Sequence, residues 1–203
     1  MCGVVGYSST KPVEQDYKIL YDLIIQSKIR GLHSFGYTFY DEVLTTKKYH
    51  NIDNITLPAS ANKIIYHNRY STSGDYKLHE NNQPITNTDM SLVFNGVIDM
   101  RTKEEMQDYY NIKMHTDNDG EILLHKCSNK DDIKEFVQNI SGSFAGLILT
   151  KQGNMYAIRN NNRPLWRMCI NDSVFYASTK DIFERVNEEY EPEQLIPNVI
   201  YES

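Results

Sequence analysis

The sequence is poor in cysteine and has no long apolar run, and these two absences exclude several classes of protein. Its 203 residues include three cysteines, Cys2, Cys127 and Cys169, which are too few and too unevenly spaced for a disulfide framework. No apolar stretch approaches the roughly 18 residues of a transmembrane helix. The N-terminus lacks the charged and apolar segments of a secretory signal. We therefore expect a cytoplasmic protein with no membrane partner, in which Cys127 and Cys169 are buried, inert thiols.

Metal-binding patterns and an excess of basic residues are also missing. The six histidines form no HxH or HExxH pair, and there is no CxxC, so we expect no metal. There is no P-loop, phosphosugar-binding pattern or nucleotide fingerprint, and we expect no cofactor. A net charge of −6 leaves no basic stripe to neutralise phosphates, which argues against a nucleic-acid partner.

What is present is the composition of an ordinary globular domain, with 40% hydrophobic and 24% charged residues. We expect one domain spanning residues 1–203 and an α+β fold. A strand at 91–94 should stop at a turn formed by Asn95-Gly96, and Asn118 or Asp117 should cap a helix that starts near 119. By periodicity, the other strands are expected at 2–7, 36–41, 63–67, 144–149, 155–159, 166–170, 173–177 and 198–202, and the helices at 13–28, 102–109, 119–127, 131–140 and 179–186.

The first residues, Met1-Cys2-Gly3-Val4-Val5-Gly6, suggest a chemical role. If Met1 is removed, Cys2 carries both a thiol and a free α-amine, whose reference pKa is about 7.7–8.0. An N-terminal amine beside a side-chain nucleophile is a known way to activate that nucleophile. Taken alone the signal is weak, because a protein can begin Met-Cys by chance.

Four further segments, in this order and at these separations, strengthen that interpretation. They read RGLHSFG at 30–36, HNRYSTSG at 67–74, FNGVI at 94–98 and NDGEILLH at 118–125. Together with the N-terminal Cys-Gly, the set resembles the glutaminase domain of class II glutamine amidotransferases. The resemblance covers essentially the whole chain, because it extends to Gly142-Ser143-Phe144-Ala145, Arg163-Pro164-Leu165 and Tyr176-Ala177-Ser178-Thr179.

The resemblance implies a fold and a reaction. The fold is that of the N-terminal nucleophile hydrolases, a four-layer αββα sandwich of two mainly antiparallel sheets. The thiol of Cys2 attacks the side-chain amide of L-glutamine to form a thioester, and glutamate and ammonia are released. Asn95 and Gly96 supply the amide donors that stabilise the oxyanion. Considered by itself, Asn95-Gly96 is a simple hairpin turn.

Substrate recognition needs a partner for each charged group of glutamine. Arg69 offers a planar fork for the α-carboxylate, and Asp119 offers an anion for the α-ammonium. Asp117, two residues earlier, competes with Asp119 for that role. Thr72 is expected to add a hydroxyl or backbone contact, and Tyr70 to line the pocket. Instead of binding substrate, Arg69 and Asp119 could simply be surface charges. We interpret His67 and His79 as structural residues rather than as catalytic bases.

Some positions depart from the family pattern, notably Tyr70, Ser73 and Phe94, where the family often has Trp, His and His. With no synthase domain in the chain, three hypotheses stay open. The first is an amidotransferase subunit that supplies ammonia to a separate synthetase or transferase. The second is a stand-alone amide hydrolase of the same fold with another substrate. The third is a catalytically silent binding module, if Met1 is retained. The oligomeric state is left open.

Overall fold

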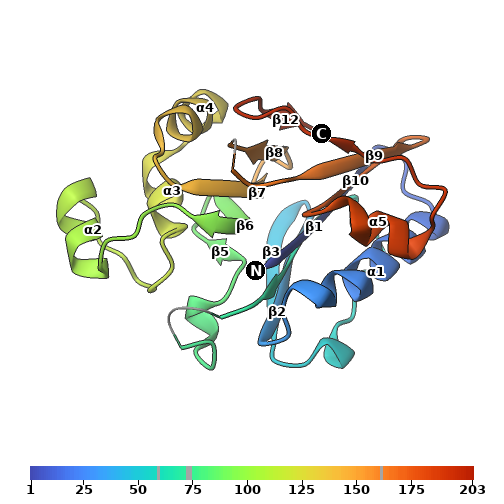
Figure 1. Cartoon of the computed structure of the whole chain (residues 1–203), viewed down its shortest axis with the longest axis horizontal. Helices are drawn as coiled ribbons and strands as arrows, with labels where there is room; N and C mark the ends of the chain where they lie inside the picture. The colour runs from blue at the N-terminus through green and yellow to red at the C-terminus, as the bar shows by residue number, and fades with distance from the viewer. Residues whose placement is uncertain (59, 72–74, 161) are drawn as a thin grey trace.

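The computed structural model describes residues 1–58, 60–71, 75–160 and 162–203, and it consists of two antiparallel sheets enclosed by helices (Figure 1). The larger sheet has the strand order β11-β9-β10-β1-β4-β2-β3. Its strands are β1 (Gly3–Ser9), β2 (Ser34–Asp41), β3 (Val43–Tyr49), β4 (Lys63–Arg69), β9 (Trp166–Ile170), β10 (Ser173–Ala177) and β11 (Glu193–Gln194). β1 lies at the centre of this sheet, between β10 and β4, and is buried along its whole length.

The smaller sheet has the order β12-β8-β7-β6-β5. Its strands are β5 (Ile85–Thr86), β6 (Met90–Val97), β7 (Ser143–Thr150), β8 (Met155–Arg159) and β12 (Tyr201–Glu202). β6 packs against β1 and β4 of the other sheet. Because β5 spans only two residues and pairs with Ser91 and Leu92, no strand among the described residues lies on that side of the C-terminal part of β6.

The helices cover the outer face of each sheet, which gives four layers (Figure 1). One apolar cluster joins the larger sheet to α1 and α5, a second joins the smaller sheet to α2, α3 and α4, and a third fills the space between the sheets. The helices are α1 (Glu14–Ser27), α2 (Lys103–Tyr110), α3 (Glu121–Lys126), α4 (Lys130–Asn139) and α5 (Lys180–Val186), and the short 3₁₀ helices are η1 (Lys28–Arg30), η2 (Ile52–Asn54) and η3 (His79–Asn81). This is the predicted α+β, αββα sandwich.

Several local predictions are wrong. β6 does not stop before Asn95-Gly96 but runs through both residues to Val97, paired with β7. The strand β3 was not predicted, because its alternating residues are half exposed and polar. Neither Asn118 nor Asp117 caps α3, whose first turn follows Gly120; Asn118 Oδ1 instead accepts from the N–H of Gly120 at 3.0 Å.

None of the helices in the described part of the chain has the length and apolarity needed to cross a membrane. Within the same residues, no three His, Cys, Asp or Glu side chains are placed to hold a metal ion together.

Candidate active site

A small cavity lies where the N-terminus meets the ends of β4 and β6. Figure 1 shows the N-terminus near the middle of the view, beside β1 and the β5–β6 region. The cavity brings together five of the predicted site residues with the open alternative Asp117, and adds residues of the 81–83 segment. Its lining residues are Cys2, His67, Arg69, Tyr70, Asn81, Gln83, Phe94, Gly96, Asp117, Asn118 and Asp119.

Cys2 immediately precedes the central strand, and its position is fixed from both sides. Its Sγ lies 3.8 Å from the carbonyl oxygen of Tyr70, and its own carbonyl accepts from Arg30 Nε at 2.8 Å. Burial raises the pKa of the Cys2 thiol, while the Tyr70 carbonyl contact, the N-terminal charge and two arginines oppose that shift. The thiol is therefore protonated near neutral pH and needs a base before it can act as a nucleophile.

Gly96 presents its backbone N–H toward the cavity rather than to the neighbouring strand. Gly96 stands opposite Phe144, whose N–H and C=O both bond to Asn160 on the other side of β7. In an antiparallel ladder such a pair exchanges no hydrogen bonds, so the Gly96 N–H points away from β7. Two residues earlier, the Phe94 N–H points the same way and donates to Gln83 Oε1 at 2.6 Å. Past Phe94, this edge of β6 borders the cavity.

Only glycine fits at position 96. Its φ is +147°, in a region that side chains disfavour, and a Cβ there would lie 1.8 Å from the carbonyl oxygen of Ser143. The sequence therefore needs glycine here for the backbone of β6 to approach β7 this closely.

Asn95 points into the layer between the sheets. Leu92 and Phe94 belong to the cluster on the helix side of β6, whereas Val93 belongs to the cluster between the sheets. By the two-residue alternation of a strand, Asn95 shares the inner layer with Val93 and with Val4 of β1. Its side chain is 4% exposed, and its Nδ2 is buried without a hydrogen-bond partner among the described residues. A buried amide donor of this kind costs free energy unless a ligand meets it.

Arg69, at the end of β4, supplies a cation to the cavity. Its Nη1 donates to the carbonyl of Asn81 at 3.0 Å and to Asn82 Oδ1 at 2.6 Å, which fixes the plane of the guanidinium. Burial lowers the pKa of Arg69, partly offset by Cys2 and Asp75, yet a guanidinium keeps its charge at any physiological pH.

Asp117 and Asp119 both line the cavity but have different partners. Asp119 Oδ2 accepts from the N–H groups of Ile98 and Asp99, at 2.5 and 3.1 Å. Burial raises the pKa of Asp119, and these backbone donors oppose the shift. Asp117 is exposed, and its oxygens already meet Lys103 Nζ at 3.5 Å and Asn81 Nδ2 at 3.2 Å. Asp117 already has a cationic partner, whereas Asp119 has only backbone partners among the described residues, so Asp119 is better placed than Asp117 to bind a cation in the cavity.

The two remaining predicted contacts have different outcomes. Tyr70 lines the cavity with half of its surface exposed, and its ring stacks on His33 at 5.3 Å. Thr72 lies outside the residues that the structure describes, so its contact stays a prediction.

The 81–83 segment was not predicted as part of the site. Asn81 connects two walls of the cavity, because its carbonyl holds Arg69 and its Oδ1 accepts from the N–H of Asp117 at 2.9 Å. Gln83 binds the backbone of β6 beside the predicted oxyanion pair. The run of amides before Pro84 was visible in the sequence, but no spacing rule links it to Arg69.

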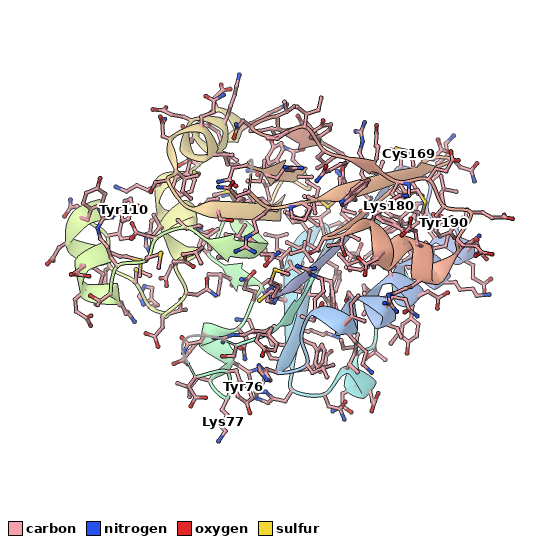
Figure 2. The ribbon with its side chains drawn as sticks, in the orientation of Figure 1. Tyr76, Lys77, Tyr110, Cys169, Lys180 and Tyr190 are labelled. Carbon is pink, nitrogen blue, oxygen red and sulfur yellow. The ribbon has the colours of Figure 1, made fainter. Side chains whose placement is uncertain are left out.

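The other two cysteines lie outside this cavity. Cys127 is buried as predicted, and burial raises the pKa of its thiol to about 12. Cys169 is exposed, so the prediction that it is buried is wrong; it lies on β9 and is labelled at the upper right of Figure 2.

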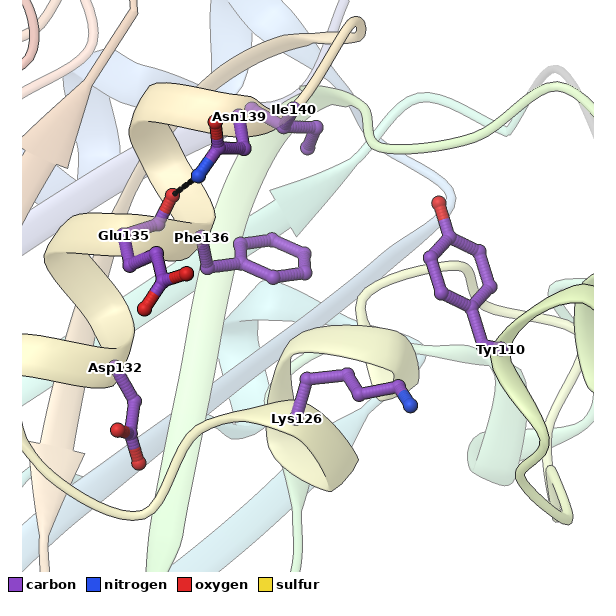
Figure 3. A pocket seen from close by; sticks show the side chains of 7 residues that line it. All are labelled: Tyr110, Lys126, Asp132, Glu135, Phe136, Asn139 and Ile140. Atoms are coloured by element: carbon purple, nitrogen blue, oxygen red, sulfur yellow. Dashed lines mark hydrogen bonds between the residues drawn. The ribbon is translucent and has the colours of Figure 1, made fainter.

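A second cavity, between α2, α3 and α4, has none of this chemistry. Figure 3 shows Tyr110 facing Phe136 and Lys126 across it, with Asp132 and Glu135 on α4. It holds no thiol, and the hydroxyl of Tyr110 is already bonded to Asp99 Oδ2 at 2.8 Å. The N-terminal cavity is therefore the candidate active site.

Comparison with known proteins points to one family. A family model described as a glutamine amidotransferase domain matches residues 67–185. The chain is 28% identical over 197 residues to a glutamine–fructose-6-phosphate aminotransferase (isomerizing) of Tropheryma whipplei (strain Twist), covering 81% of this chain and 30% of that protein. It is 26% identical over 196 residues to an amidophosphoribosyltransferase of Pasteurella multocida (strain Pm70), covering 81% and 38%. The chain thus spans between 30% and 38% of these relatives' length.

Solved structures show the same fold. A glutamine phosphoribosylpyrophosphate amidotransferase from B. subtilis, complexed with ADP and GMP, matches with a TM-score of 0.76 at 22% identity, over 100% of this chain and 49% of that one. A structure described as the allosteric regulatory enzyme of purine biosynthesis matches with a TM-score of 0.78 at 24% identity, over 100% and 48%.

Proposed function

The chain belongs to the family of class II glutamine amidotransferase domains, and from this premise we propose that it hydrolyses the side-chain amide of L-glutamine, with Cys2 as the N-terminal nucleophile once Met1 has been removed. The supporting observation is that two amide donors lie on neighbouring residues of β6, at the cavity that Cys2 lines. The Gly96 N–H faces the cavity that Cys2 lines, and the Asn95 Nδ2 is buried without a partner. An oxyanion formed at the attacked carbon would satisfy both donors.

The first half-reaction releases ammonia. The α-amine of Cys2 takes the thiol proton, and the thiolate forms a bond to the amide carbon of glutamine. The oxyanion of the tetrahedral intermediate is stabilised by Asn95 and Gly96, at about 3–4 kcal/mol for a donor of this kind. The intermediate then collapses: the C–N bond breaks, the nitrogen takes the proton from the α-ammonium, and ammonia leaves a γ-glutamyl thioester.

Water completes the cycle. The neutral α-amine removes a proton from a water molecule, the resulting hydroxide attacks the thioester carbon, and the same donors stabilise the second oxyanion. The C–S bond breaks, the sulfur recovers its proton, and glutamate leaves.

The charges around the cavity suit a free amino acid. Arg69 is held in one plane by Asn81 and Asn82, which suits it to the α-carboxylate of glutamine. Asp119 keeps one oxygen on the 98–99 backbone and offers the other to the α-ammonium. Tyr70 and Thr72 are proposed to complete the pocket. An N-blocked amide would lack the cation that Asp119 requires, so these charges favour glutamine over an unrelated amide.

Release of glutamate from glutamine tests the proposal. The Cys2→Ala variant of the Met1-free protein should lose activity by at least about 10³-fold and still bind glutamine, whereas Cys169→Ala should keep activity within about twofold, because that thiol is remote from the cavity. Undiminished turnover by Cys2→Ala would refute the assignment.

We further propose that the ammonia is consumed by an acceptor enzyme on a separate synthetase or transferase subunit. The supporting observation is that the matched relatives are named as an aminotransferase and a phosphoribosyltransferase, which are group-transferring enzymes. Glutamine-dependent amination by the mixed proteins, abolished by Cys2→Ala and restored by added ammonia, would support this. Amination that persists undiminished with Cys2→Ala would contradict it.

A further inference from the structure

Two arginine side chains converge on the N-terminus from opposite sides of the site. Arg30, in η1, donates through Nε to the carbonyl of Cys2 at 2.8 Å, and its Nη2 lies 3.8 Å from Met1 Sδ. Arg163, between β8 and β9, places its Nη1 3.4 Å from the same sulfur atom. The side chain of residue 1 thus occupies the gap between two guanidinium groups.

Arg163 is held there by a contact that does not involve Met1. Its Nε donates to Ser143 Oγ at 2.7 Å, and Ser143 is paired with Val97 at the end of β6. Removal of Met1 therefore leaves Arg163 anchored on the strand pair that carries Asn95 and Gly96.

Neither arginine has a carboxylate partner in the part of the chain that the structure describes. Among the described residues, no Asp or Glu oxygen lies within 4 Å of either guanidinium group. Asp181 attracts Arg30 from a longer distance, but its ion-pair partner is Arg185, at 3.7 Å. Burial lowers the pKa of Arg30, and the positive charge of Arg163 acts in the same direction. Two close, uncompensated cations are a costly arrangement in a chain of net charge −6, and this cost suggests a function.

Building on the proposed function, we infer that Arg163, together with Arg30, keeps the α-amine of Cys2 in its neutral, proton-accepting form at neutral pH. The Cys2 nitrogen adjoins residue 1, whose side chain contacts both guanidinium groups, and their positive charge disfavours an α-ammonium there, so the amine enters the reaction as a base. After it has taken the thiol proton, the same repulsion makes the ammonium a stronger acid toward the departing nitrogen. Arg163 acts through the amine and is a positioning residue.

Other charges around the amine do not cancel this effect. In the free protein Arg69 and Asp119 carry opposite charges that offset each other, and Asp117 is already paired with Lys103. Arg101, which shares a surface hollow with Arg163, is paired with Asp99 at 2.6 Å. The positive groups around the N-terminus are Arg30 on η1, Arg69 on β4 and Arg163 before β9. The negative groups are Asp117 and Asp119, both before α3. Asp181 on α5 acts on Arg30.

The test is the pH dependence of kcat/KM for glutamine in the Met1-free protein. In Arg163→Gln the acidic limb, where the amine becomes protonated, should move to higher pH by about 0.5–1 unit, because loss of a nearby positive charge raises the pKa of the amine. Activity well above that limb should stay within about threefold of the wild type, and Arg163→Lys should restore the limb. The matched control is Arg167→Gln. It removes a cation of β9 that is paired with Glu193 of β11, and it should leave the acidic limb at the same pH.

A second readout does not depend on turnover. The ¹³Cα chemical shift of labelled Cys2 follows protonation of its amine, and in Arg163→Gln its titration midpoint should rise by the same amount. An unmoved midpoint, or a loss of activity equal at every pH, would overturn the inference and leave Arg163 with a structural role. If the wild type shows no Cys2-dependent hydrolysis at any pH, the proposed function fails instead, and the two failures are distinguishable.

Discussion

Asn95 and Gly96 follow each other in one strand, yet they offer different donors to the same region. Asn95 contributes a side-chain amide in the layer between the sheets, and Gly96 contributes a backbone N–H directed away from β7. The sequence pattern Asn-Gly predicts a turn. In the structure, Gly96 instead adopts an unusual φ within β6, which lets β6 and β7 approach closely.

At this scale, Asn95→Ala should lower kcat by about 10²–10³-fold and change KM for glutamine by less than about threefold. The lost donor acts on the oxyanion, which exists only in the transition state and the intermediate. Steady-state kinetics checks this. A rise in KM with an unchanged kcat would instead place Asn95 in substrate binding.

The two carboxylates can be separated by matched substitutions. Asp119→Asn should raise KM for glutamine at least about tenfold and reduce the preference for glutamine over N-acetylglutamine, because the partner of the α-ammonium is lost. Asp117→Asn, which weakens the contacts of this exposed carboxylate with Lys103 and Asn81, should change both quantities by less than about threefold. The reverse result would assign the ammonium to Asp117.

At the scale of elements, β1 begins directly after Cys2, and one buried carboxylate accepts hydrogen bonds from both β1 and the start of α1. Asp16 Oδ2 accepts from the Val13 N–H at 3.1 Å, from the Tyr7 hydroxyl at 3.1 Å and from the Ser173 hydroxyl at 2.7 Å. These donors come from the start of α1, from β1 and from β10. One side chain therefore joins the helix to the two strands beneath it.

Asp16→Ala should lower the free energy of unfolding by about 2–4 kcal/mol, because three donors lose their shared acceptor in a buried place. Glu14→Ala, an exposed substitution in the same helical turn, should cost less than about 0.5 kcal/mol. Urea unfolding measures both values. A similar loss for the two variants would show that Asp16 is not the connection.

The elements also show what a sequence can and cannot predict. β8, β9 and β10 match their predicted bounds, because each is a short apolar run closed by Gly, Asn, Asp or Pro. β3 was missed because its half-exposed residues carry no apolar period. The family resemblance predicted that Cys2, Arg69 and Asp119 share one site, and all three line the same cavity. The support from Asn81, Asn82 and Gln83 depends on tertiary contacts, which no local pattern encodes.

At the scale of the whole molecule, the sandwich buries a histidine between its sheets, at the inner wall of the cavity. His67 on β4 is 1% exposed, and burial, with a smaller effect from Arg69, lowers its pKa to about 3. Its unfolded value is near 6.5, so below that pH the unfolded chain binds a proton that the folded chain excludes. Stability is then lost as the pH falls from about 6.5 toward 3.

Comparison of the wild type with His67→Gln checks this effect. Between pH 7 and pH 5 the wild type should lose about 2 kcal/mol more unfolding free energy than the variant. Urea unfolding at pH 7, 6 and 5 gives the difference. Parallel curves would show that His67 takes up its proton in the folded state.

The central claim is that Cys2 becomes residue one and is the nucleophile. Intact mass of the purified protein, before and after reaction with a glutamine-mimicking electrophile, followed by peptide mapping, tests both parts in one experiment. We predict loss of Met1, a single adduct, its location on Cys2, and protection by glutamine. Turnover by a protein that retains Met1, or an adduct on Cys127 or Cys169 with Cys2 unmodified, would contradict the claim.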